Sequence, residues 1–154
     1  MPAPPEPIVS RAAIGAHPIH PMIIHFPVAA LLGLVAVDAA YLYGADPFWA
    51  RAGLWLAGVG AVGGWIASAV GLIDLLTVAA IRRKITAWCH ALLAVMMLSA
   101  ATLNWLLRYR DGLDGSLAVG APWLSLLTAA LIAVAAWLGA RLVYEHAVGV
   151  DLTQ

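Results

Sequence analysis

Histidine is the residue type in this sequence with the clearest capacity for chemistry, because its imidazole binds metals and exchanges protons near neutral pH. The chain has five histidines, which are His17, His20, His25, His90 and His146. Two histidines on facing helices can hold a haem iron from both sides, and three close in sequence can bind copper, zinc or iron. The sequence therefore predicts a haem or transition-metal centre, provided that the fold brings some of these imidazoles together.

The elements that must position the histidines are four long apolar segments. Hydrophobic residues make up 64% of the chain and charged residues only 10%, against about a quarter charged in a soluble domain. Each segment has about the 20 residues needed to cross a bilayer core as a helix: Met22–Tyr43, Arg51–Leu76, Ile85–Leu107 and Val119–Tyr144. Because the linkers are short, we predict an all-α membrane protein with four transmembrane helices in an up-down-up-down antiparallel bundle.

Three parts are expected along the chain. Residues 1–21 are rich in proline and predict an extended or irregular N-terminal arm. Residues 22–150 form the transmembrane domain, and residues 151–154 a C-terminal tail. The linkers, residues 44–47, 80–84 and 108–115, hold most of the charges and turn formers. The start lacks the pattern of a cleavable signal peptide, so the first helix is expected to remain in the mature protein.

Basic residues indicate an orientation. One side of the predicted bundle carries Arg11, Arg82, Arg83, Lys84 and Arg141, and the other carries Arg51, Arg108 and Arg110. The positive-inside rule then places both termini and the Arg82–Lys84 loop in the cytoplasm. That loop is interpreted as a topology signal, with contact to anionic lipid as a second use. A formal net charge of zero gives no support for a nucleic-acid partner.

Small residues at helical spacing predict which faces of the helices touch. The stripe is His25, Ala29 and Ala36 on the first helix, and Gly60, Gly64, Ala67, Gly71 and Asp74 on the second. On the third helix it is His90, Ala94, Met97, Ala101 and Asn104, and on the fourth Thr128, Ala135, Gly139 and His146. Close helix packing alone accounts for the glycines and alanines, but each stripe also ends in a polar group.

Alternating helix direction gathers the polar ends at one membrane face. We predict that His25 and His90 are ligands of one shared centre, with His146 as the next candidate. Asp74 is expected to accept a hydrogen bond from the other ring nitrogen of a ligand. At the opposite face, Asp38 and Asn104 are expected to hydrogen-bond each other.

Simpler interpretations stand beside these. A bare metal ion held by His17, His20 and His25 is the alternative centre, but the first two can equally lie among lipid headgroups. His146 can cap its helix or extend toward the interface, and Asp74 can be solvated. A single cysteine, Cys89, excludes an internal disulfide. The sequence has no nucleophile elbow, phosphate-binding loop, dinucleotide fingerprint or zinc-protease motif, so hydrolase or transferase activity has no support.

Several motifs together resemble a bacterial membrane family known as domain of unknown function 2231. The most specific is His17-Pro18-Ile19-His20-Pro21-Met22-Ile23-Ile24-His25-Phe26-Pro27, with three histidines and three prolines in eleven residues. The others are Gly71-Leu72-Ile73-Asp74, the stretch from His90 through Asn104 to Arg108, and Leu142-Val143-Tyr144-Glu145-His146. The resemblance covers His17 to about Val150. It departs from the family at Ala94, where the family often has asparagine.

The resemblance implies a four-helix domain in the bacterial inner membrane, and fusion of some members to Rieske or cytochrome c-like domains favours electron transfer. The leading hypothesis is therefore a small cytochrome b-like protein that binds haem b, or a transition-metal ion, and passes electrons to a redox partner protein. The alternatives are a non-catalytic subunit or metal-binding module of a larger complex, and a small proton or metal-ion transporter. The lipid bilayer is an expected partner, and a homo-oligomer is possible in each case.

Overall fold

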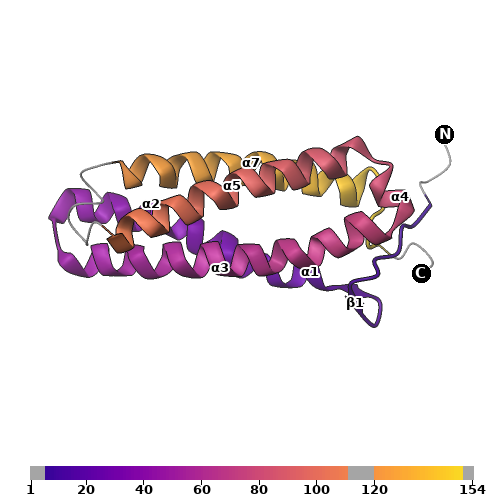
Figure 1. The fold of residues 1–154 in the computed structure, drawn as a ribbon, viewed down its shortest axis with the longest axis horizontal. Coiled ribbons are helices and arrows are strands. Elements are labelled where there is room, and N and C mark those ends of the chain that lie inside the picture. Colours follow the sequence, from indigo (N-terminus) through magenta and orange to yellow (C-terminus); the bar gives the residue numbers. More distant parts are fainter. Residues whose placement is uncertain (1–5, 111–119, 151–154) are drawn as a thin grey trace.

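The computed structural model describes residues 6–110 and 120–150 of the chain. These residues form two short strands and six helices (Figure 1): β1 (Ala13–Ile14), β2 (His17–Pro18), α1 (Ile19–Ile23), α2 (His25–Gly44), α3 (Pro47–Thr77), α4 (Ala79–Arg82), α5 (Ile85–Arg110) and α7 (Ala121–Tyr144). The first five residues of the predicted arm, most of the third predicted linker, the start of the fourth predicted span at Val119 and the predicted tail lie outside the described residues.

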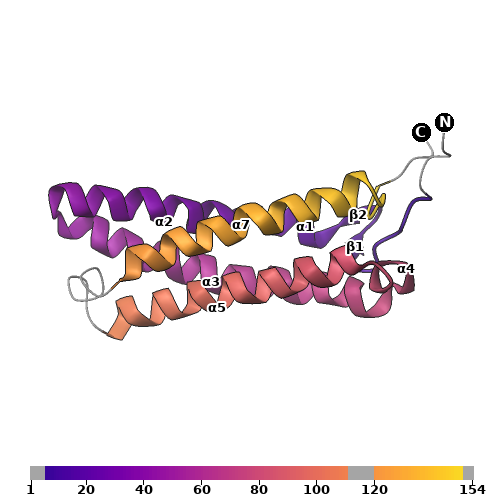
Figure 2. The same cartoon turned by 90° about the horizontal axis from the view of Figure 1, so that it is seen from above.

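Four helical segments are long and apolar enough to cross a membrane, as predicted: Ile19–Gly44, Pro47–Thr77, Ile85–Arg110 and Ala121–Tyr144. Two views show these four segments lying along one long axis, with α4 and the β1–β2 hairpin at the same end (Figures 1 and 2). Helix α2 packs against α3 and α7, and α5 packs against α3 and α7. Many large apolar side chains point outward, among them Trp55 and Trp137, as expected where lipid surrounds the protein.

Local chemistry extends two helices beyond their predicted ends. The side chain of Asp46 accepts a hydrogen bond of 2.8 Å from the backbone nitrogen of Phe48, and Pro47 occupies the first helical position. Helix α3 therefore begins before the predicted Arg51. Helix α5 continues to Arg110, so Arg108, which was predicted to lie in a linker, is a helical residue.

The N-terminal arm is more ordered than its prolines predicted. Strands β1 and β2 pair in an antiparallel hairpin whose turn contains Gly15 at a φ of +61°. Helix α1 begins directly after Pro18, and Pro21 falls in its first turn, where a helix needs no backbone donor. The predicted boundary at residue 21 is therefore too late. As a consequence, His20 belongs to the helical segment rather than to an irregular arm.

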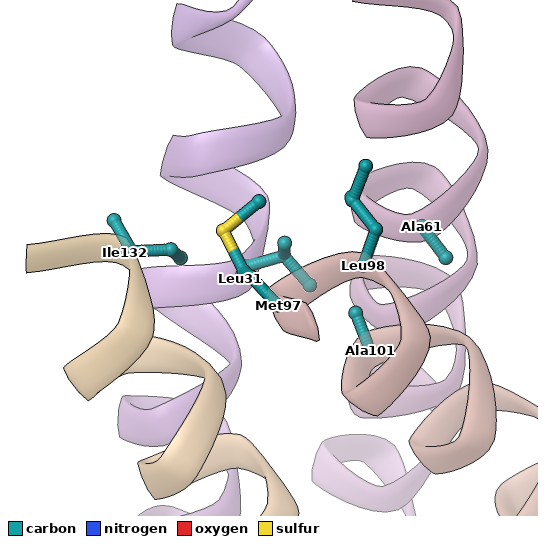
Figure 3. Packing of buried hydrophobic residues seen from close by; sticks show 6 residues of the cluster. All are labelled: Leu31, Ala61, Met97, Leu98, Ala101 and Ile132. Carbon is teal, nitrogen blue, oxygen red and sulfur yellow. The ribbon is translucent and has the colours of Figure 1, made fainter. Parts of the chain in front are cut away.

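The centre of the bundle is an apolar cluster contributed by all four long helices (Figure 3): Leu31, Ala61, Met97, Leu98, Ala101 and Ile132. Glycines on α3 make room for it. A Cβ atom at Gly60 would come within 2.5 Å of Leu31, and one at Gly64 would overlap Leu98. Gly60, Gly64, Ala67 and Asp74 are all buried, which confirms the predicted inward stripe of this helix.

The predicted stripe of the first helix is wrong. His25, Ala29 and Ala36 are exposed, and the buried residues of α2 are Pro27, Ala30, Leu31, Leu34 and Asp38. The physical reason is that a tight contact needs a small residue on only one of its two sides. Because α3 supplies glycine, α2 can present leucine, as Leu31 does to Gly60.

Candidate functional site

Two imidazoles meet inside the bundle, and they are those of His20 on α1 and His90 on α5. Their ring centroids are 6.3 Å apart and their planes are almost perpendicular, at 88°. Nδ1 of His20 lies 2.8 Å from the carbonyl oxygen of Ala67 on α3. Nδ1 of His90 lies 2.9 Å from the carbonyl oxygen of Ala135 on α7. Because a carbonyl only accepts, both rings carry a proton on Nδ1, and a neutral ring then has its lone pair on Nε2.

Glycines determine where the two rings can lie. Gly71 follows Ala67 by four residues on α3, and Gly139 follows Ala135 by four residues on α7. A Cβ atom at Gly71 would be 3.0 Å from Nδ1 of His20, and one at Gly139 would be 3.4 Å from Cε1 of His90. Each imidazole therefore packs over a glycine and reaches a carbonyl one helical turn away. The same alanine-to-glycine spacing thus serves both histidines.

A second buried polar centre joins α2, α5 and α7. Nη2 of Arg108 donates to Oδ2 of Asp38 at 2.7 Å, and Nε of Arg108 donates to Oδ1 of Asn104 at 2.8 Å. The hydroxyl of Ser125 donates to Asp38 at 2.6 Å and accepts from Asn104 at 2.9 Å. Arg108 is 2% exposed and Asp38 3%, so each charge offsets the cost of burying the other. The expected direct bond between Asp38 and Asn104 is replaced by bonds through Arg108 and Ser125.

The two centres occupy equivalent positions in an internal repeat. His20 and Asp38 are 18 positions apart, and so are His90 and Arg108. The buried Leu31, Leu34 and Asp38 of α2 each correspond, 70 positions later, to buried residues of α5: Ala101, Asn104 and Arg108. The buried residues Gly53, Ala57, Gly60, Gly64 and Ala67 of α3 correspond, 68 positions later, to buried residues of α7: Ala121, Ser125, Thr128, Ile132 and Ala135.

This repeat divides the bundle into two helical hairpins, α1 to α3 and α5 to α7. Equivalent residues touch each other: His20 meets His90, and Asp38 meets Arg108. The repeat relates α2 to α5 and α3 to α7. The contact between α3 and α5 is therefore equivalent to the contact between α7 and α2, and both contacts are present. Contacts between equivalent residues are what a two-fold arrangement of two copies produces. The histidine pair and the ion pair therefore both lie where the hairpins face each other.

The structure does not gather the remaining predicted site residues around His90. His25 is exposed on the outer face of α2, because its helix presents the opposite face to the bundle, and His17 is exposed on β2. His146 lies beyond the end of α7 and lines a separate cavity. Within residues 6–110 and 120–150, no three histidine, cysteine, aspartate or glutamate side chains are close enough to hold a metal ion together.

Asp74 accepts hydrogen bonds from the N-terminal arm and from no imidazole. Its carboxylate accepts from the hydroxyl of Ser10 at 2.5 Å, the backbone nitrogen of Arg11 at 2.7 Å and that of Ala12 at 3.0 Å. The carbonyl of Ala12 in turn accepts from the backbone nitrogen of Ile19 at 2.8 Å, directly before His20. Asp74 is therefore linked to His20 through the arm, and backbone carbonyls, rather than the Asp74 carboxylate, are bonded to the two imidazoles.

Four apolar helices around a half-buried histidine pair and a buried ion pair define an all-α integral membrane protein. The model of a family described as "Predicted membrane protein (DUF2231)" matches residues 16–152. The chain therefore belongs to that family, as the motifs around the histidines implied. Comparison with curated proteins gives no match, and comparison with solved structures gives none either.

Proposed function

We propose that this protein is a small membrane cytochrome b-like protein in which His20 and His90 bind haem b and support electron transfer. The observation that carries the proposal is the pairing of two imidazoles whose Nδ1 atoms are both bonded to backbone carbonyls. Metal-bound histidines usually donate the second ring nitrogen to such an acceptor, which fixes the ring and raises its basicity. His20 here replaces the His25 that the sequence favoured.

The distance between the rings supports a single ion between them. A metal about 2.0–2.1 Å from each ligand nitrogen, with the two nitrogens on opposite sides, separates the ring centroids by roughly 6 Å. The observed separation is 6.3 Å. A haem iron is commonly held by histidine, and His20 and His90 would be the residues that hold it here. A bare ion usually needs three or four protein ligands, and the described residues offer no such group.

The protein's own contribution is to fix the orientation of the two half-buried imidazoles. Each hairpin fixes its own histidine: α3 bonds His20 and α7 bonds His90. Gly71 and Gly139 leave the space that the rings need. The residue one helical turn from His90 on α5 is Ala94, whose side chain is also small. When bound, haem iron supplies one-electron chemistry that no side chain of this chain provides.

An electron-transfer role is better supported than ion transport. The apolar cluster shown in Figure 3 lies between the histidine pair and the Asp38–Arg108 pair along every long helix. A path for protons or metal ions would need polar groups or water across that layer. The proposal includes a bacterial inner-membrane location with both termini in the cytoplasm, based on the positive-inside rule. It also includes a redox partner protein, and leaves room for a homo-oligomer.

The test is haem content after expression with a haem supply, measured by absorption and by pyridine haemochrome assay. Wild-type protein should show a Soret band. His20→Ala and His90→Ala should each retain less haem, because each variant removes one of the two imidazoles that would hold the iron. His25→Ala is the matched control, since that side chain is exposed on the neighbouring helix, and it should retain the haem.

Elemental analysis of the same samples separates haem from a bare metal ion. Metal lost with either His20 or His90, without a Soret band, would replace haem by an ion at the same imidazoles. Wild-type protein with neither haem nor metal would refute the proposal and favour a non-catalytic membrane subunit. If the His25 variant loses the haem and the His20 variant keeps it, the ligands would be His25 and His90, as the sequence predicted.

A further inference from the structure

A charged cavity lies at one end of the bundle, away from the histidine pair. It has a volume of about 450 Å³ and is lined by Glu6, Ile8, Ala80, Arg83, Lys84, Glu145 and His146. Its residues come from the N-terminal arm, the α4 region that connects the two hairpins, and the segment after α7. Three separate parts of the chain therefore build one cavity at the end that carries the basic loop.

Backbone pairing between the arm and the segment after α7 forms one wall of the cavity. The backbone nitrogen of Ile8 donates to the carbonyl of Ala147 at 2.9 Å, and that of Gly149 donates to the carbonyl of Ile8 at 2.8 Å. Below them a small apolar cluster of Leu75, Ile81 and Ala87 packs against Ile8. The wall is thus a paired and packed structure.

Two of the cationic side chains that line the cavity, Arg83 and Lys84, have no carboxylate partner among the described residues. Glu145 is taken up by Arg141, whose Nε lies 2.9 Å from both carboxylate oxygens and whose Nη2 lies 2.8 Å from one of them. This contact lowers the pKa of Glu145, so the carboxylate stays ionised and bonded. Within residues 6–110 and 120–150, no carboxylate pairs with Arg83 or Lys84. These two side chains therefore face the cavity with their charge unneutralised.

Aromatic residues place this end at the level of lipid headgroups. Trp88, near the start of α5, is 47% exposed, and its ring nitrogen donates to the carbonyl of Arg82 at 2.9 Å. Tyr144, the last residue of α7, is 84% exposed. Tryptophan and tyrosine with an apolar body and a polar atom are characteristic of the membrane–water interface. The cavity thus opens where a phospholipid presents its phosphate.

We infer that this cavity binds the headgroup of an anionic phospholipid, with Arg83 and Lys84 contacting the phosphate and His146 adding a third nitrogen donor. Basic pockets at the ends of transmembrane helices bind such headgroups by charge and hydrogen bonding. Glu6 is the one lining carboxylate with no described partner, which leaves the cavity positive. The lipid would then hold together the arm, the inter-hairpin connection and the segment after α7. The site is independent of the histidine pair.

The test compares retention of phosphatidylglycerol and phosphatidylcholine by the purified full-length chain, using native mass spectrometry from mixed micelles. Two basic contacts predict roughly a thirtyfold preference for phosphatidylglycerol. The double variant Arg83→Gln/Lys84→Gln should lose this preference. Arg51→Gln removes an exposed arginine near the start of α3, away from this cavity, and should leave the preference intact.

Helical content and melting of each variant without added lipid show whether the variants are folded. Equal retention of the two lipids by wild type would overturn the inference, and so would a preference that survives in the double variant. A last measurement adds inorganic phosphate to the lipid-bound protein. If millimolar phosphate displaces the lipid, the cavity is a free-phosphate site and the lipid assignment is wrong. A double variant that fails to fold would be replaced by Lys84→Gln alone, which should reduce the preference by roughly fivefold.

Discussion

The buried ion pair between Asp38 and Arg108 gives the sharpest test of how the two hairpins are held together. Among residues 6–110 and 120–150, Asp38→Ala removes the one carboxylate bonded to Arg108 and leaves the guanidinium with Asn104 and Ser125 as neutral acceptors. Breaking a buried pair from one side costs about 3–5 kcal/mol, because a charge remains buried without compensation. We expect Asp38→Ala to lower the free energy of unfolding by that amount.

The double variant Asp38→Ala/Arg108→Met should recover most of the loss, since no unpaired charge remains and methionine fills much of the space. The assay is reversible unfolding in mixed micelles for wild type, both single variants and the double variant. The coupling between the two positions should be about 2 kcal/mol or more. Additive effects of the single substitutions would refute the view that the two hairpins are joined by a coupled pair.

The remaining predictions concern packing, positioning and orientation. Gly64→Leu should destabilise the detergent-solubilised bundle by several kcal/mol, because the leucine side chain would overlap Leu98. Ala133→Leu, on the exposed face of α7, should change the melting temperature little. Equal shifts in melting temperature for the two variants would contradict the assignment of Gly64 to the inward face. Asp74→Asn should weaken haem retention without abolishing it, because the arm before His20 loosens while both ligands remain; unchanged retention together with an unchanged arm in proteolysis would disprove this positioning role. A reporter fused after Gln154 should give a cytoplasmic signal, and a periplasmic signal would reverse the proposed orientation.

Hydropathy and small-residue spacing predicted much of the architecture, for reasons specific to membranes. Lipid requires long, uninterrupted helices, and close helix contact requires small residues, so the four spans and the inward face of α3 follow from composition and period. Arg108 was misplaced because a charge near the end of an apolar run normally marks a loop. Here Asp38, 70 positions earlier, neutralises it inside the bundle. A sequence read one segment at a time cannot show that compensation.

The choice of His25 over His20 has a related cause. Small residues at helical spacing predict the inward face of a helix, and Ala29 and Ala36 therefore predict that His25 faces inward. In the folded chain the glycines of α3 let α2 turn Leu31 and Leu34 inward, whereas Ala29 and Ala36 face outward. The inward direction of one helix thus depends on what its neighbour presents, and a stripe on a single helix does not determine it.

The internal repeat would have identified, from the sequence alone, the histidine that lies beside His90. A shift of 70 positions relates Asp38 to Arg108 and His20 to His90, whereas the same shift carries His25 to Val95. Two hairpins that pack as equivalent halves bring equivalent residues together where the two-fold axis crosses their interface. The pair that can share one ion is therefore the pair that the shift relates. By the same reasoning, a relative of this chain that keeps both histidines 70 positions apart, with alanine-to-glycine spacings on the following helices, should keep the centre even if the residue at His25 changes.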